Sequence, residues 1–461
     1  MFELTCFTIG ILFLLGSVDD LIIDAVHAFH RLRPQKIPKE QWNAWRAFPE
    51  KPIAIMIPAW KESAVLEAMV KTNLARIRYQ NYKWYIGVYP NDPETLSVAK
   101  DLQRRHPSRI VVVVTDRPGP TSKAHCLNCI MSVLHDEDSI SDLKWSPHWV
   151  AIHDAEDVIH PDAFTAINAQ PSDRDFIQLP IFSLPVPASE WVSGTYLDEF
   201  AEIHLREIPV RKILHMPIPS AGVGTFFSAP LLMKLGDKFG YWFDEENLTE
   251  DYEISLRIAR LGGRQDFLLL LDEGLEPVAT REYFPRELGR SIRQKTRWTT
   301  GIGLQTMAKW GSYGSFSRDF FKHRNWLTAY AVFRDRKALW ANPTVMFALF
   351  MILVFAFLMV DSRHFFLIHH RESLLALASI NTGLFTFRFF QRARFCTRIY
   401  GKKQGVLSIP RVMISTYING VACIRALHQY FFARARNRQN KIEWDKTDHR
   451  FPTIPTEQRT S

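Results

Sequence analysis

Two short acidic segments have residue types and a spacing suited to chemistry on a charged substrate. The first, residues 154–157 (DAED), follows the apolar run 150–152. Three carboxylates so close together repel one another, and a hard divalent cation with oxygen ligands would relieve that repulsion. Mg²⁺ or Mn²⁺ held by one or two of these carboxylates could also bind a diphosphate. A solvated acidic loop is the alternative interpretation.

The second acidic segment, residues 249–251 (TED), precedes a run of helical spacing that ends at two glycines, residues 262–263. Asp251 could act as a general base and accept the proton of an acceptor hydroxyl group. The structural alternative is that this segment only forms the start of the helix. Thr249 is a common type of N-cap residue, and acidic side chains stabilise the first turn of a helix.

A third segment, residues 285–310, is basic, has helical spacing and contains the sequence QKTRW. Gln294, Arg297 and Trp298 are separated by three and four residues, so they share one face of a helix. An arginine can bind a diphosphate through paired hydrogen bonds, and an indole ring can stack on the apolar face of a sugar. An amphipathic helix on a membrane surface is the alternative, and the two interpretations are compatible.

An alternating pattern of strands and helices is expected to position these groups. Short apolar segments predict strands at 52–58, 84–89, 110–114 and 149–153, and the intervening residues 62–78, 95–105 and 122–135 have helical spacing. This pattern predicts an α/β fold with a mostly parallel sheet, in which ligands bind at the carboxyl ends of the strands. Polar residues follow all four strands at that edge, among them Glu62, Asp92, Lys123 and Asp154.

Apolar segments near both ends of the chain predict association with a lipid bilayer. Residues 338–360 carry no charge and are long enough to cross a bilayer, and 4–29 and 373–390 are weaker candidates. Basic residues after the first and third segments place the intervening 31–337 region in the cytosol. We therefore expect an anchor at 1–30, a cytosolic catalytic domain at 50–310, transmembrane and interfacial helices at 338–432 and a cytosolic basic tail at 433–461.

The net charge of +9 lies largely in the runs that flank the apolar segments, which favours anionic lipid over nucleic acid as the partner. No nucleic-acid-binding motif is recognisable, so no nucleic-acid partner is expected. Among five scattered cysteines, Cys126 and Cys129 form a CxxC beside His125. A redox or metal role is conceivable for this group, but the favoured interpretation is a helical pair that packs into the core.

The ordered set DAED, TED and QKTRW resembles the family 2 glycosyltransferases of the GT-A fold. The last segment fits the QxxRW pattern of the membrane-integrated branch that includes cellulose and hyaluronan synthases. The resemblance covers about residues 50–310. It implies an inverting transfer of a sugar from a nucleotide-diphospho-sugar, with one base, one Mg²⁺ or Mn²⁺ ion and no enzyme nucleophile.

The resemblance also implies roles for individual residues. Glu156 is the second acid of the metal pair, and residues 222–226 (GVGTF) lie where the family has an acceptor loop. Ser122 and Cys126 replace a glycine and an alanine of the family pattern around Lys123. The implied roles are a nucleotide pocket of Pro58, Glu62, Asp92, Lys123 and Asp154, a metal pair of Asp154 and Glu156, the base Asp251, and acceptor or diphosphate contacts from Glu250, Gln294, Arg297 and Trp298.

These expectations describe a multi-pass enzyme of the bacterial inner membrane that contributes to a surface or exported polysaccharide. The favoured donor is a UDP-sugar, the acceptor is a growing glycan or a lipid-linked molecule, and a homodimer or an export partner is expected. The alternative is a non-catalytic scaffold or nucleotide-sensing subunit of a glycan export or phage-receptor complex. Turnover of a nucleotide-sugar distinguishes the two.

Overall fold

The computed structural model describes residues 2–140, 146–306, 323–360, 370–433 and 451. The chain forms two compact units. The α/β unit comprises Arg33–Leu184, Pro217–Tyr283 and Lys441–Ser461, and the helical unit comprises Met1–Leu32, Pro185–Met216 and Phe284–Asn440. Two segments of the region expected to be catalytic, 185–216 and the part from Phe284 onward, therefore belong to the helical unit.

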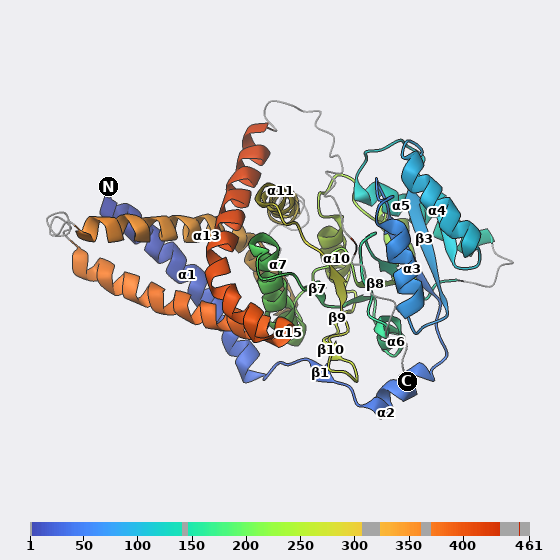
Figure 1. Ribbon diagram of the computed structural model, residues 1–461, viewed down its shortest axis with the longest axis horizontal. Coiled ribbons are helices and arrows are strands. Elements are labelled where there is room, and N and C mark those ends of the chain that lie inside the picture. The colour runs from blue at the N-terminus through green and yellow to red at the C-terminus, as the bar shows by residue number, and fades with distance from the viewer. Residues whose placement is uncertain (1, 141–145, 307–322, 361–369, 434–450, 452–461) are drawn as a thin grey trace. The chain divides into compact units, whose positions relative to one another are not determined.

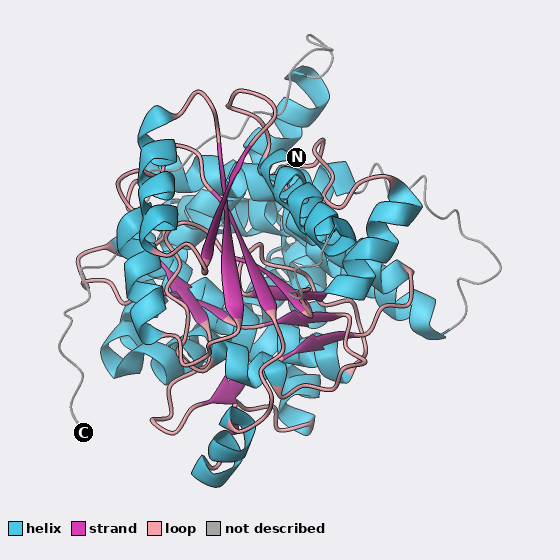
Figure 2. Ribbon diagram, turned by 90° about the vertical axis from the view of Figure 1, so that its right-hand side faces the viewer, coloured by secondary structure: helices cyan, strands magenta, loops and turns pink. Residues whose placement is uncertain are grey.

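The α/β unit is built on one seven-stranded sheet, which Figure 2 shows as a twisted array of strands. Neighbouring strands run parallel except at β8, which is antiparallel to both β5 and β6. The expected α/β class with a mostly parallel sheet is confirmed. The strand order is β4 (Ile110–Val114), β3 (Tyr82–Val88), β2 (Ile53–Pro58), β5 (Trp149–Ile152), β8 (Thr225–Ser228), β6 (Phe176–Gln178) and β9 (Gln265–Phe267).

The four predicted strands are β2 to β5, and each lies within two residues of its expected bounds. Their apolar residues are buried, apart from three valines of β4, because helices such as α3, α4 and α5 pack beside them (Figure 1). Two parallel pairs, β1 (Gln35–Lys36) with β10 (Leu270–Leu271) and β7 (Ile181–Ser183) with β11 (Thr280–Glu282), complete the strands. The helices are α2 (Lys39–Arg46), α3 (Leu66–Arg76), α4 (Pro93–Arg105), α5 (Lys123–Ile140), α6 (Ala163–Asn168), α9 (Ala229–Phe239) and α10 (Glu250–Arg260).

The core of the α/β unit is dominated by large aromatic residues. Trp42, Trp84, Trp149 and Phe164 are fully buried around the central strands. Aromatic side chains each remove a large apolar area from water, so they contribute strongly to the stability of this unit. The polar strand ends are thereby held on a rigid frame.

The helical unit contains two helices that are long and apolar enough to cross a membrane, Glu3–Phe29 and Arg371–Phe432. The span expected at 338–360 lies within α13, and the side chains of 353–360 lie outside the described part of the chain. The span expected at 373–390 lies in the first part of α15, and this helix is kinked at Gly401, whose φ and ψ angles are not helical. The helices are α1 (Phe2–Phe29), α7 (Trp191–Glu202), η1 (Ile203–Glu207), α8 (Ile208–Ile213), α11 (Leu288–Thr299), η2 (Thr300–Gln305), α13 (His323–Val360), α15 (Arg371–His428) and η4 (Gln429–Ala433).

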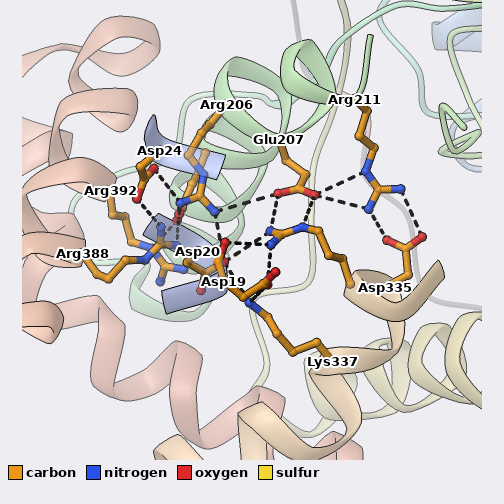
Figure 3. A network of polar contacts seen from close by, with 12 residues as sticks. Asp19, Asp20, Asp24, Arg206, Glu207, Arg211, Asp335, Lys337, Arg388 and Arg392 are labelled. Carbon is orange, nitrogen blue, oxygen red and sulfur yellow. Dashed lines mark hydrogen bonds and ion pairs between the residues drawn. The ribbon is translucent and has the colours of Figure 1, made fainter. Parts of the chain in front are cut away.

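A network of buried ion pairs joins these helices (Figure 3). Arg206 lies 3.0 Å from Asp24 of α1, and Arg334 of α13 lies 2.8 Å from Glu207 and 3.3 Å from Asp20. Several further pairs extend it. They include Lys337 with Asp19, Arg211 with Asp335, Arg388 with Asp24 and Arg392 with Glu202.

We predict that Arg334→Met destabilises the helical unit by about 1–3 kcal/mol, because the partly buried Glu207, Asp19 and Asp20 each lose one of their basic partners. Thermal unfolding of the detergent-purified protein measures the effect. The control is Arg104→Met, which removes the exposed pair with Asp101 on α4 and should cost less than about 1 kcal/mol. Equal shifts of the two variants would contradict a structural role for the network.

Candidate active site

The acidic loop after β5 is organised by Asp157, whose side chain points inward. Its Oδ2 atom accepts the Asp154 N–H at 3.1 Å and lies 2.8 Å from Nδ1 of His153. Asp157 and His153 are both buried, whereas Asp154 is partly exposed. The three acids of the DAED segment are therefore not equivalent, because Asp157 closes the turn that carries Asp154 and Glu156.

The ionisable groups of this loop influence one another's pKa values. Burial raises the pKa of Asp157 well above its usual value, and Asp154 and Glu156 raise it further. Burial lowers the pKa of His153 to about 3, so its imidazole is neutral at physiological pH and can donate a hydrogen bond to Asp157. None of the described residues donates a hydrogen bond to the buried Oδ1 atom of Asp157. A divalent cation would relieve this concentration of negative charge, and the oxygen donors of Asp154 and Glu156 fit Mg²⁺ or Mn²⁺.

Lys123, the first residue of α5, provides a positive charge within the same acidic region. Its Nζ atom lies 2.5 Å from Oδ1 of Asp154. Burial alone would lower the pKa of Lys123, but the carboxylates of Asp154, Glu250 and Asp251 raise it above the usual value. The lysine is therefore charged at physiological pH, and the structure brings it together with acids from two different segments.

Asp251 is the second residue of α10, and its Oδ1 atom accepts the Tyr252 N–H at 2.8 Å. Burial raises the pKa of Asp251, although Lys123 opposes that effect. A carboxylate with a raised pKa is a stronger proton acceptor. Thr249 occupies the N-cap position of α10, but its side chain makes no capping hydrogen bond and instead contacts Asn247.

A glycine-containing loop approaches Asp251 closely. Gly222 has a φ angle of +80°, and a Cβ atom at this position would lie 2.7 Å from Oδ2 of Asp251. Both the backbone conformation and the lack of space favour glycine here. The 222–226 segment, weak as a sequence pattern, is therefore a neighbour of the predicted base.

A residue that the sequence analysis missed, Gln178, holds this loop in place. Its amide nitrogen lies 2.9 Å from the Val223 carbonyl oxygen, and its amide oxygen accepts hydrogen bonds from the Ala221 N–H and the Thr225 hydroxyl at 3.1 and 2.7 Å. Gln178 is almost fully buried at the end of β6. A single glutamine in a sequence gives no indication of a loop 43 residues away along the chain.

The residues expected around the nucleotide base include contacts between the loops that follow β2 and β3. Pro58 is the last residue of β2, and Asp92 accepts the Lys61 N–H at 2.5 Å and the Thr95 N–H at 3.3 Å. Asp92 therefore caps α4 and fixes the buried turn that carries Glu62. A nucleotide-binding role for these three residues stays a prediction.

The QKTRW segment forms the expected helix, α11 of the helical unit. Gln294 accepts a hydrogen bond from the Tyr196 hydroxyl at 2.9 Å. The Trp298 ring packs edge-on against the Tyr196 ring, with 6.3 Å between the ring centroids. Arg297 is partly exposed on the same helix. Joint action of these side chains with Asp251 stays a prediction.

Comparisons with known proteins identify the family of the chain and its fold. The family model described as "Glycosyltransferase like family 2" matches residues 49–301. Bacteriophage adsorption protein B of Escherichia coli K12 and bacteriophage N4 adsorption protein B of Escherichia coli O157:H7 are each 33% identical to the chain over 486 residues. The match covers 98% of this chain and 63% of each relative, so the chain spans less than two thirds of their length.

Among solved structures, the mannosyltransferase PcManGT from Pyrobaculum calidifontis, in complex with GDP-Man and Mn²⁺, is similar in fold. The TM-score is 0.50 at 16% sequence identity, and the match covers 83% of this chain and 99% of PcManGT. At this identity the likeness identifies the fold alone, which is GT-A.

We predict that Gln178→Leu frees the 221–225 loop and destabilises the α/β unit by about 1–3 kcal/mol, because several buried polar groups lose their partner. Hydrogen exchange followed by mass spectrometry should show faster exchange of the loop amides. The matched control is Gln170→Leu, which removes only a contact with Ala166 at the end of α6. Unchanged exchange in the loop would show that other contacts hold it.

Proposed function

The chain belongs to the family 2 glycosyltransferases, and on that premise we propose that it transfers a sugar from a nucleotide-diphospho-sugar to a growing glycan or lipid-linked acceptor, with inversion at the anomeric carbon. The observation that carries the proposal is the cluster of Lys123, Asp154 and Asp251. It combines a positive charge suited to a diphosphate, a cation ligand and a base with a raised pKa.

The proposed mechanism is a single in-line displacement that needs no covalent intermediate with the enzyme. Asp251 accepts the proton of the acceptor hydroxyl as that oxygen attacks the anomeric carbon and the bond to the nucleotide diphosphate breaks. Lys123 binds the diphosphate and offsets its charge. Asp154 and Glu156 would hold Mg²⁺ or Mn²⁺, which supplies further charge stabilisation for the departing diphosphate when bound.

The identity of the donor rests on less direct support. PcManGT carries GDP-Man and Mn²⁺ in its complex, which supports a nucleotide-sugar donor and a divalent cation here. A UDP-sugar is favoured by the family resemblance. We assign Pro58, Glu62 and Asp92 to contacts with the base and ribose of the nucleotide. Contacts with the acceptor or the diphosphate are assigned to Glu250, Gln294, Arg297 and Trp298.

We place the reaction at the cytosolic face of a bacterial inner membrane. The long apolar helices Glu3–Phe29 and Arg371–Phe432 support membrane association, and the names of the two relatives concern phage adsorption. A product displayed at or exported to the cell surface is consistent with those names. A homodimer or an export partner would complete a path for the product through the membrane.

We predict that Asp251→Asn lowers turnover by about 10²–10⁴-fold, since the amide cannot accept the proton. Nucleotide release by the detergent-purified protein, tested on UDP- and GDP-sugars with Mg²⁺ or Mn²⁺, measures turnover. Because the base must be ionised, wild-type turnover should fall as the pH drops through the raised pKa of Asp251.

The control for this substitution is Asp237→Asn, which changes an exposed carboxylate of α9 and should leave turnover unchanged. Donor binding by the Asp251 variant should remain close to that of the wild type. Tight donor binding without turnover in the wild type would instead favour the scaffold or nucleotide-sensing alternative.

A second prediction concerns the loop beside the base. Gly222→Ala should reduce kcat while donor affinity is largely retained, because the added methyl group displaces Asp251 or the loop. Gly240→Ala is a matched control, since Gly240 also has a positive φ angle (+74°) but no atom lies within 4 Å of a Cβ atom there. Equal loss of kcat in both variants would attribute the effect to backbone strain alone.

A further inference from the structure

A second cluster of potential metal ligands lies outside the catalytic carboxylates. Asp116 is in the loop after β4, and His125 and Cys129 are one turn apart on α5. The Nε2 atom of His125 lies 3.0 Å from Oδ1 of Asp116 and 3.7 Å from Sγ of Cys129, and the Sγ and Oδ1 atoms are 3.5 Å apart.

We propose that Asp116, His125 and Cys129 form a binding site for a borderline-soft divalent cation, represented by Zn²⁺. Tetrahedral zinc bound to one sulfur, one imidazole nitrogen and one carboxylate oxygen requires these atoms to be separated by about 3.3–3.6 Å. The three observed separations, 3.0, 3.5 and 3.7 Å, lie close to that range. Small side-chain movements would complete the geometry.

The histidine of this cluster is oriented as zinc-binding histidines usually are. Its second nitrogen, Nδ1, lies 3.4 Å from Oε1 of Glu245, and a carboxylate in that position fixes the ring and the tautomer. Glu245 is itself held by Asn128 at 3.3 Å and by Arg117 at 2.6 Å. The Arg117 guanidinium, which can only donate, also contacts Nδ1, and that contact requires Nε2 to carry the ring proton. Binding of a cation at Nε2 would move this proton to Nδ1, which would then donate to Glu245, while Arg117 keeps its own contact with Glu245.

The ligand types distinguish this site from the one at Asp154 and Glu156. Thiolate and imidazole ligands select zinc-like ions, whereas carboxylate oxygens alone suit Mg²⁺ and Mn²⁺. The Asp116 and Glu245 carboxylates bring negative charge to this site. A bound dication offsets that charge and displaces the thiol proton of Cys129.

The other cysteine of the CxxC does not take part. Cys126 is fully buried, and its sulfur lies 2.4 Å from the position of a Cβ atom at Gly87 of β3. The site thus has three protein ligands, which leaves a fourth position for water or an external ligand. A cation there would tie the loop that carries Asp116 to the helix that begins with Lys123.

The test uses the full chain in detergent, freed of metal with a chelator and then titrated with Zn²⁺ or with Co²⁺ as a spectroscopic probe. We expect about one equivalent of Co²⁺ to give a thiolate-to-metal charge-transfer band. The band should be lost in Cys129→Ser and in His125→Asn and kept in Cys126→Ala. Glu245→Gln should weaken binding by about 10–100-fold.

A chemical readout on the wild type does not depend on variants that fold poorly. Zn²⁺ should protect Cys129 from alkylation, as followed by mass spectrometry of its peptide, and Mg²⁺ should not. The band should persist in Asp154→Asn, which separates this site from the catalytic one. Alkylation of Cys129 at the same rate with and without Zn²⁺, or a band that survives Cys129→Ser, would overturn the proposal.

Discussion

The concentration of negative charge around the Lys123 ammonium group is the constraint on which the rest of the α/β unit depends. Asp154 contacts Lys123 directly, and Glu250 and Asp251 lie close enough to raise its pKa. These acids come from segments almost a hundred residues apart, so only the ordered edge of the sheet can hold them together. The repulsion among them is what a bound divalent cation would relieve, and this is the physical basis for the cation and diphosphate site that we propose.

The close approach of a backbone loop to Asp251 imposes a second constraint. The loop can approach Asp251 closely only because Gly222 has no side chain. A glycine offers no side-chain contacts that would restrain the backbone at this position. Gln178 supplies that restraint through hydrogen bonds to loop backbone groups and to Thr225. This loop is thus held by a buried amide, whereas the strand ends are held by the apolar core.

Local patterns predicted the central strands and the acids at their ends, because an apolar strand followed by a polar turn leaves a clear trace in sequence. They did not predict the inward orientation of Asp157, the role of Gln178 or the separate environments of Cys126 and Cys129. Each of these depends on a partner from a distant segment or on which face of a helix meets the sheet. The same limit applies to α15, where the non-helical φ and ψ angles of Gly401 introduce a kink that the sequence pattern did not predict.

The helical unit also contains a group of neighbouring acidic residues, and basic side chains from several helices balance their charge. Asp19, Asp20 and Asp24 lie in the largely apolar α1, where a carboxylate without a counter-charge is costly to bury. Arg206 and Arg334 from other helices balance this charge, and Arg388 of α15 also contacts Asp24 (Figure 3). The packing of α1 is therefore coupled to that of α13 and α15, because the charges of the first helix are fully balanced only when these later helices are in place.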